Sequence, residues 1–220
     1  MDHQTKRTAQ AMEQMTETNA VRLCGTLAGP PVFSHESRGR RFYTFPLEVR
    51  RLSGNSDTLN IVLRREQLEA VEAAGREKLL ITGQLRSYNN RRGEGAKLVL
   101  TVLAKELLLC DGPDENSVRL TGTLCRAPNL RVTPMGRDIC DLMLAVNRSY
   151  SRSDYLPCIC WGLRAREAAR WPVGTAVRLE GRFQSRRYIK LTEAGPVERV
   201  AYEVSVTEAE TPETAEPVFL

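Results

Sequence analysis

The chain has 220 residues, 41% of them hydrophobic and 27% charged, which is typical of soluble globular proteins and long enough for two domains of about 100 residues. No apolar run approaches the roughly 20 residues that a membrane helix needs, so we expect no membrane contact. The net charge of +5 is unevenly spread, because no Lys or Arg follows Arg199 whereas five Glu do. A basic body with an acidic end indicates a polyanionic ligand.

The first half of the chain reads as short strands with one helix. Residues 1–18 are polar, lack the apolar stretch of a signal peptide and predict a disordered arm of a cytoplasmic protein. Alternating apolar and polar residues predict strands at 21–27, 42–49 and 59–65, and a helix follows at 66–75 with Gly75 as its C-cap. Two further strands are predicted at 78–87 and 96–109. The glycine within 21–27 predicts a bulge or bend.

The second half repeats the first. Residues 19–66 match residues 116–163 without a gap at an offset of 97, with 16 identities in 48 positions, where unrelated chains of average composition would give about 3. After one inserted residue, 83–87 matches 181–185. The same elements are therefore predicted again: strands at 118–124, 139–146 and 156–162, a helix at 163–171, and strands at 176–185 and 200–206. Residues 111–115 read as a short linker.

Three strands, a short helix and two more strands within about 90 residues is the order expected of an OB-fold, a five-stranded, partly open barrel. The sequence thus predicts a mainly β protein with two tandem OB-fold barrels, each with its helix between the third and fourth strands, and disordered termini. The predicted boundaries are an arm at 1–18, a first barrel at 19–110, a second barrel at 116–207 and an acidic tail at 208–220.

The cysteines and histidines do not indicate a metal site. No CxxC pair is present, and His3 and His35 have no metal-like spacing. We expect no metal or other cofactor, and we expect reduced, mostly buried thiols acting as small hydrophobes. The six cysteines are Cys24, Cys110, Cys125, Cys140, Cys158 and Cys160.

The second repeat resembles the bacterial single-stranded DNA-binding proteins, in a tandem OB-fold form. The residues that carry the likeness are N-x-V-x-L-x-G-x-L at 116–124, Pro128, T-P-x-G at 133–136, LAVNRSY at 144–150 and the stretch from CICWG to GRFQSR ending at Arg186. The resemblance implies sequence-independent binding of single-stranded DNA in replication, recombination or repair, in the cytoplasm at the nucleoid.

The resemblance also implies which side chains stack on bases. The four stacking positions of that family fall on Tyr150, Tyr155, Trp161 and Tyr188. A protein that binds single strands of any sequence needs such flat π surfaces beside cations that follow the phosphates. The cations interleaved with these rings are Arg148, Arg152, Arg186, Arg187 and Lys190.

The first repeat departs from this pattern. Its residues at the four stacking positions are Ser53, Thr58, Arg64 and Asn90, so all four rings are missing. Cations remain, and we expect phosphate contacts or an assembly surface with little stacking; the candidate binding residues here are Arg64, Arg86, Arg91 and Arg92. An Arg can itself stack on a base, so Arg64 is a partial substitute for a ring. Phe42, Tyr43 and Phe45 are candidate core residues, and Tyr88 a candidate exposed one.

The tail and the assembly are further expectations from the family. Residues 208–220 are acidic and poor in apolar residues until the last three, which predicts disorder. Pro217–Leu220 is a loose relative of the hydrophobic tip through which family members recruit replication and repair proteins; a plain solubilising tail is the alternative. Family members commonly place four barrels around one DNA path, so two barrels per chain imply a homodimer.

Other functions of the same barrel stay open on the sequence alone. A primosome-type or RNA-binding relative would use it on a different nucleic acid, and an interaction module would pack its aromatic residues against protein. An enzyme is not expected, because the sequence shows no convergent Ser/His/Asp set, metal cluster or phosphate-cradling glycine loop.

Overall fold

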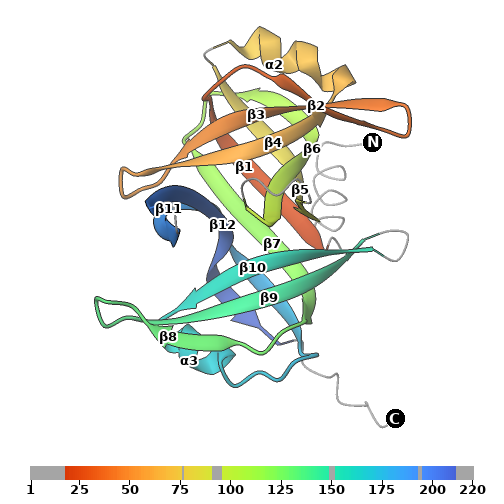
Figure 1. Cartoon of the computed structure of the whole chain (residues 1–220). Helices are drawn as coiled ribbons and strands as arrows, with labels where there is room; N and C mark the ends of the chain where they lie inside the picture. The colour runs from red at the N-terminus through yellow and green to blue at the C-terminus, as the bar shows by residue number, and fades with distance from the viewer. Residues whose placement is uncertain (1–17, 76, 91–95, 149–151, 193–194, 212–220) are drawn as a thin grey trace, which may run out of the picture.

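The computed structural model describes residues 18–75, 77–90, 96–148, 152–192 and 195–211. It is built almost entirely of antiparallel strands arranged as two barrels, with one short helical segment in each (Figure 1). The predicted mainly β class with OB-fold barrels is confirmed. Among the described residues, no helix is long and apolar enough to cross a membrane.

The first barrel is a closed ring of five strands. In spatial order these are β1 (Asn19–Leu27), β3 (Arg40–Arg50), β4 (Ser56–Arg64), β6 (Leu98–Cys110) and β5 (Lys78–Asn89). Only the β4–β6 pair is parallel, and β1 pairs with both β5 and β3, which closes the ring. A 3-10 turn η1 (Arg65–Gln67) and helix α2 (Leu68–Ala74) follow β4, and the helix ends at Gly75, as predicted, with φ of 57°.

The second barrel repeats this arrangement. Its ring is β7 (Glu115–Leu124), β9 (Asp138–Arg148), β10 (Arg152–Trp161), β12 (Gly195–Glu210) and β11 (Ala176–Thr192), with β10 and β12 parallel. Helix α3 (Leu163–Ala168) is shorter than the predicted 163–171. Beyond Ala168 the backbone continues as turns, with the Arg170 amide donating to the Glu167 carbonyl oxygen and the Trp171 amide to that of Ala168. Pro172 disfavours a helical conformation at Trp171.

Each barrel carries a sixth strand that the sequence did not predict. Strand β2 (Val32–Ser37) pairs with the outer end of β3, and β8 (Asn129–Val132) pairs with β9. Every residue of both strands is exposed. The predicted five-stranded barrel is confirmed, and each barrel has an additional edge strand. The edge strands lack the buried alternation that identifies a strand in a sequence.

Strands β1 and β7 join the barrels into one twelve-stranded sheet. They pair antiparallel, with Val21 opposite Val118, and these two residues are equivalent in the repeat. The two barrels are therefore related by a local two-fold axis through this pair. Residues 111–115 were predicted as linker, but Glu115 already belongs to β7 and lies opposite Cys24.

The glycine shared by the first strands of the two repeats allows the ring to close. An added Cβ at Gly25 would lie 2.3 Å from the Glu48 carbonyl oxygen, and one at Gly122 would lie 2.5 Å from that of Ala145. Each glycine sits where the first strand of a barrel turns from one neighbour to the next. The bend predicted there follows from this close backbone approach.

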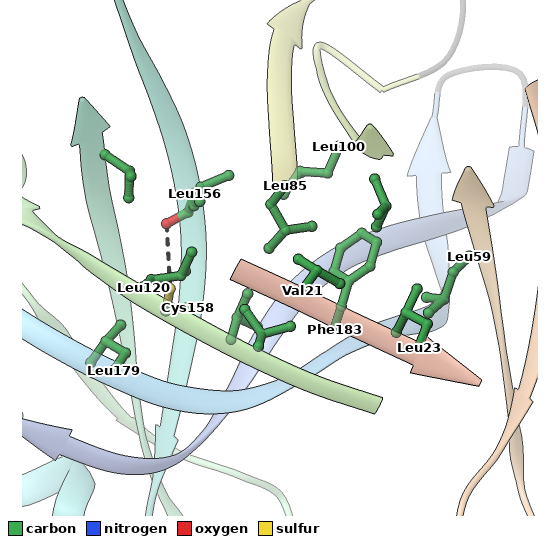
Figure 2. Close-up of a cluster of buried hydrophobic side chains, with 14 of the residues drawn as sticks. Val21, Leu23, Leu59, Leu85, Leu100, Leu120, Leu156, Cys158, Leu179 and Phe183 are labelled. Atoms are coloured by element: carbon green, nitrogen blue, oxygen red, sulfur yellow. Dashed lines mark hydrogen bonds between the residues drawn. The ribbon is translucent and has the colours of Figure 1, made fainter. Parts of the chain in front are cut away.

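The apolar cores of the two barrels form one continuous cluster across the joint (Figure 2). Val21 and Leu85 from the first barrel lie near Phe183 from the second, and all three are almost fully buried. Cys158 belongs to this cluster and donates from Sγ to the Leu156 carbonyl oxygen over 3.5 Å. Because the apolar core is continuous across the joint, the two barrels form one packed unit and not two domains joined only by a linker.

All six thiols are free, and four of them are buried, as expected. Burial raises the pKa of Cys160 to about 12 and that of Cys24 likewise to about 12. Cys24 Sγ donates to Cys110 Sγ over 2.9 Å. Cys125 is the exposed exception. No group of three or more metal-ligating side chains exists within the described residues.

The ends of the chain fall mostly outside the description. The predicted arm at 1–18 lies outside it except for Thr18, whose carbonyl oxygen accepts from the Thr121 amide over 2.8 Å. The predicted tail at 208–220 begins too early, because β12 continues to Glu210. Arg178 lies opposite Glu210 in the β11–β12 pairing, so the strand continues into a segment whose acidic composition suggested disorder.

Candidate nucleic-acid interface

The outer face of β10 carries two of the four predicted stacking residues. Leu156, Cys158 and Cys160 point into the core, so the alternate residues point outward. Among these, the side chain of Tyr155 is 49% exposed and that of Trp161 40% exposed. The two residues are six positions apart, which corresponds to about 20 Å along a strand. The strand therefore presents two rings on one face, spaced for several nucleotides.

The Trp161 ring and the Tyr155 backbone are each hydrogen-bonded to a neighbouring strand. Trp161 Nε1 donates to Ser205 Oγ on β12 over 3.2 Å, which fixes the polar edge of the indole and leaves the ring half-exposed. The Tyr155 amide donates to Ser87 Oγ over 2.7 Å, and Ser87 belongs to β5 of the first barrel. The first barrel thus contacts the backbone of a predicted stacking residue of the second.

Tyr188 lies within strand β11, opposite Arg199 on β12, beyond residue 185 where the sequence predicted this strand to end. The β11–β12 pairing continues to Thr192 and Gly195, so the hairpin is longer than its apolar pattern indicates. The tyrosine ring is 39% exposed, and the Arg186 guanidinium lies 5.5 Å from its centroid. A ring with a cation beside it offers both a stacking surface and a phosphate contact.

Three of the predicted cations of the second barrel lie at the surface, and some predicted site residues of both barrels lie outside the described residues. The side chains of Arg152, Arg186 and Arg187 are exposed. Arg187 lies 3.8 Å from Glu198 and Arg186 lies 3.8 Å from Glu203, loose ion pairs that solvent screens. Tyr150, Arg91 and Arg92 lie outside the described residues, as does the side chain of Lys190.

Arg148 and Arg86 were predicted as phosphate contacts, but both lie against the buried carboxylate of Asp154. Arg86 Nη1 donates to Asp154 Oδ2 over 3.0 Å, and Arg148 Nε lies 3.3 Å from the same oxygen. Arg148 Nε has no hydrogen-bond partner among the described residues, so its contact with Asp154 is electrostatic. The Ser87 amide donates to Asp154 Oδ1 over 2.7 Å.

The same arrangement recurs across the local two-fold axis. Asp57 is fully buried and accepts from Arg51 Nε over 2.7 Å and from the Ser185 amide over 2.8 Å. Hydrogen bonding to Asp57 raises the pKa of Arg51. Each barrel therefore inserts one aspartate beneath the hairpin of the other. Sequence reasoning missed this contact, although both pairs, Arg51 with Asp57 and Arg148 with Asp154, are identical in the two repeats.

At the stacking positions of the first barrel, Ser53, Thr58 and Arg64 are all exposed and offer no ring. Phe45 is buried in the core, as expected, and Tyr88 is 55% exposed. The Arg64 amide donates to Gln67 Oε1 over 2.9 Å at the start of η1, which leaves its guanidinium at the surface.

Comparison with known proteins places these features in a family context. Residues 115–211 match the model of the single-strand binding protein family. "Single-stranded DNA-binding protein B" of Bacillus subtilis is 36% identical over 80 residues, which cover 33% of this chain and 71% of that protein. "Single-stranded DNA-binding protein 2" of Listeria innocua is 35% identical over 80 residues, 33% of this chain and 50% of that protein. The chain thus spans about half the length of the first curated relatives it matches.

A solved structure has a similar two-barrel fold. The wild-type single-stranded DNA binding protein from Thermus aquaticus superposes with a TM-score of 0.72 at 24% identity, over 92% of this chain and 96% of that one. The likeness extends over both barrels, whereas the family match covers only the second.

Proposed function

The chain belongs to the single-strand binding protein family, and we propose that it binds single-stranded DNA without sequence preference and without catalysis, in replication, recombination or repair. The observation that carries the proposal is the set of exposed rings on the second barrel, Tyr155, Trp161 and Tyr188. Bases stack on the rings, and Arg152, Arg186 and Arg187 contact the phosphates. Tyr150 and Lys190 belong to the same proposed site by their sequence positions.

The two barrels have different roles in this proposal. The second, at 116–207, supplies most of the stacking. The first, at 19–110, supplies cations such as Arg64 and, through Ser87, the position of Tyr155. Arg86 and Arg148 act on the DNA only indirectly, because Asp154 engages both. Arg91 and Arg92 are proposed as further phosphate contacts.

Titration of tryptophan fluorescence with oligo-dT tests the function. Trp161 is half-exposed whereas Trp171 packs against the core, so stacking on Trp161 should quench the emission strongly. The logarithm of the binding constant should fall with the logarithm of salt concentration by about 0.7 per phosphate contacted. Oligo-rU and duplex DNA serve as comparisons. Absent quenching, or equal affinity for duplex, would overturn the proposal.

We propose that two copies of the chain assemble into a homodimer with four barrels. Light scattering after size-exclusion chromatography should then give twice the 24.7 kDa mass of the chain. A monomer mass at working concentrations contradicts this.

We further propose that the tail predicted at 208–220 recruits replication or repair proteins through the residues that follow β12, which are 211–220. A chain ending at Glu210 should lose that recruitment and keep its dT affinity.

A further inference from the structure

The first barrel carries a stacked pair of rings outside the four family positions. His35 on β2 and Phe42 on β3 have ring centroids 4.8 Å apart and planes within 7° of parallel. The His35 side chain is exposed and that of Phe42 half-buried. The strand pairing shifts between Phe33 and His35, and this bulge places the imidazole directly opposite the phenyl ring.

The position of this pair becomes informative when the two repeats are compared. Phe42 lies opposite Arg64 on β4, and the equivalent pair in the second barrel is Ile139 opposite Trp161 on β10. Directly opposite residues share one face of a sheet. In the second barrel the aromatic side chain, Trp161, is therefore on β10 and the aliphatic side chain, Ile139, lies opposite it on β9. In the first barrel a cation, Arg64, is on the equivalent strand β4, and the aromatic side chain, Phe42, lies opposite it on β3.

The exchange extends to the edge strand. At the repeat positions of Phe33 and His35 the second barrel has Leu130 and Val132. The first barrel has thus lost rings where the second stacks bases and carries rings where the second is aliphatic. The displaced ring lies one strand spacing, about 4.8 Å, from the position that corresponds to Trp161.

Cations surround the stacked pair. Arg64 lies opposite Phe42, and Arg40 lies two residues before it on the same face of β3; both side chains are exposed. Rings flanked by Arg are the combination that binds bases and phosphates of a single strand. A protein partner would require a larger apolar surface than two rings among arginines provide.

We infer that His35, Phe42, Arg40 and Arg64 form a second base-stacking site, on the first barrel, for the same single strand that binds the second barrel. This inference rests on the proposed function. A base stacks on the His35–Phe42 pair, and the two guanidinium groups hold the adjacent phosphates. The first barrel then contributes stacking as well as charge.

The opposite face of the hairpin serves a structural role and provides a control. Phe33 meets Tyr43 edge-on, with ring centroids 5.8 Å apart, and the Arg41 guanidinium lies 5.1 Å from the Phe33 centroid. Tyr43 packs against the core. Phe33 is 51% exposed but lies on the other face of the hairpin from His35 and Phe42, so it does not belong to the stacked pair and serves as the control ring.

The test uses the full chain and labelled oligo-dT of two lengths, followed by fluorescence anisotropy. One strand, of about 10 nucleotides, fits a single barrel, and one of about 35 nucleotides can span both. The variant combines His35→Val and Phe42→Ile, the residues that the second barrel has at these positions, so packing is retained. The control is Phe33→Leu, chosen by the same rule. Thermal unfolding verifies that each variant folds.

The double variant should keep wild-type affinity for the short strand, which the second barrel binds. It should lose about tenfold in affinity for the long strand, the effect of one stacked base. Phe33→Leu should match wild type on both. Unchanged long-strand affinity in the double variant, or an equal loss in Phe33→Leu, overturns the second site. Absence of wild-type binding to either strand would instead overturn the proposed function itself.

Discussion

Replacing Trp161 and Tyr188 together with Ala should lower the affinity for oligo-dT by about 30- to 10⁴-fold. Each ring is about 40% exposed and fixed by its neighbours, Trp161 through Ser205 and Tyr188 beside Arg186. A base stacked on an aromatic side chain contributes about 1–3 kcal/mol by alanine substitution, and tenfold in affinity corresponds to about 1.4 kcal/mol. Because Trp161 is removed, anisotropy of a labelled strand is the appropriate measurement.

The control replaces two stacking positions of the first barrel that have no ring: Ser53, which corresponds to Tyr150, and Asn90, which corresponds to Tyr188. Ser53→Ala together with Asn90→Ala removes no ring and no charge, so dT affinity should stay at the wild-type value. Comparable losses in the two double variants would show that the second barrel does not dominate stacking. The salt dependence offers an independent reading, because loss of stacking should leave its slope unchanged while loss of Arg186 should reduce it.

The repeat made much of the fold predictable. Once residues 19–66 were matched to 116–163, each strand was supported by two sequences, and the glycines at 25 and 122 marked the bends. The order of strands and helix was then sufficient for the OB-fold. The edge strands β2 and β8 could not be predicted in this way, because they bury no side chain and so leave no alternation.

The site was predictable only in part, for a different reason. Tyr155, Trp161 and Tyr188 stand at positions defined by local sequence and are exposed as expected. Whether a cation is exposed or paired depends instead on the residues that the other barrel places next to it. Arg86 and Arg152 are indistinguishable in sequence, yet Asp154 holds Arg86 whereas Arg152 is exposed. Contacts between residues 68 positions apart have no signature in local pattern.

The barrel joint departs from exact two-fold symmetry at one pair of residues. The first barrel has Gln84 and Arg86 where the second has Arg182 and Gln184, so the glutamine and the arginine have exchanged places. In both barrels the arginine donates to the glutamine side-chain oxygen. Burial and the nearby Arg51 lower the pKa of Arg182, whereas Arg86 is paired with Asp154. Both barrels therefore place one arginine and one glutamine at the joint, but at exchanged positions.

Asp154→Asn should destabilise the protein by about 3–5 kcal/mol, the effect of removing one partner from a buried ion pair. The Asp154 side chain is fully buried, accepts from Arg86 and from the Ser87 amide, and faces Arg148. Asparagine keeps the shape but removes the charge, which leaves two guanidinium groups near a neutral amide. Chemical denaturation followed by circular dichroism gives the free energy of unfolding.

Asp141→Asn is the control for this substitution. Asp141 accepts two hydrogen bonds from Arg131 at the surface, and both side chains are more than a third exposed, so its loss should cost at most about 1 kcal/mol. Equal destabilisation in the two variants would mean that the buried carboxylate does not hold the barrels together. Because Ser87 binds both Asp154 and the Tyr155 amide, Asp154→Asn should also weaken dT binding at temperatures where it is folded. Asp141→Asn should leave that binding unchanged, which separates a shifted stacking ring from a general loss of stability.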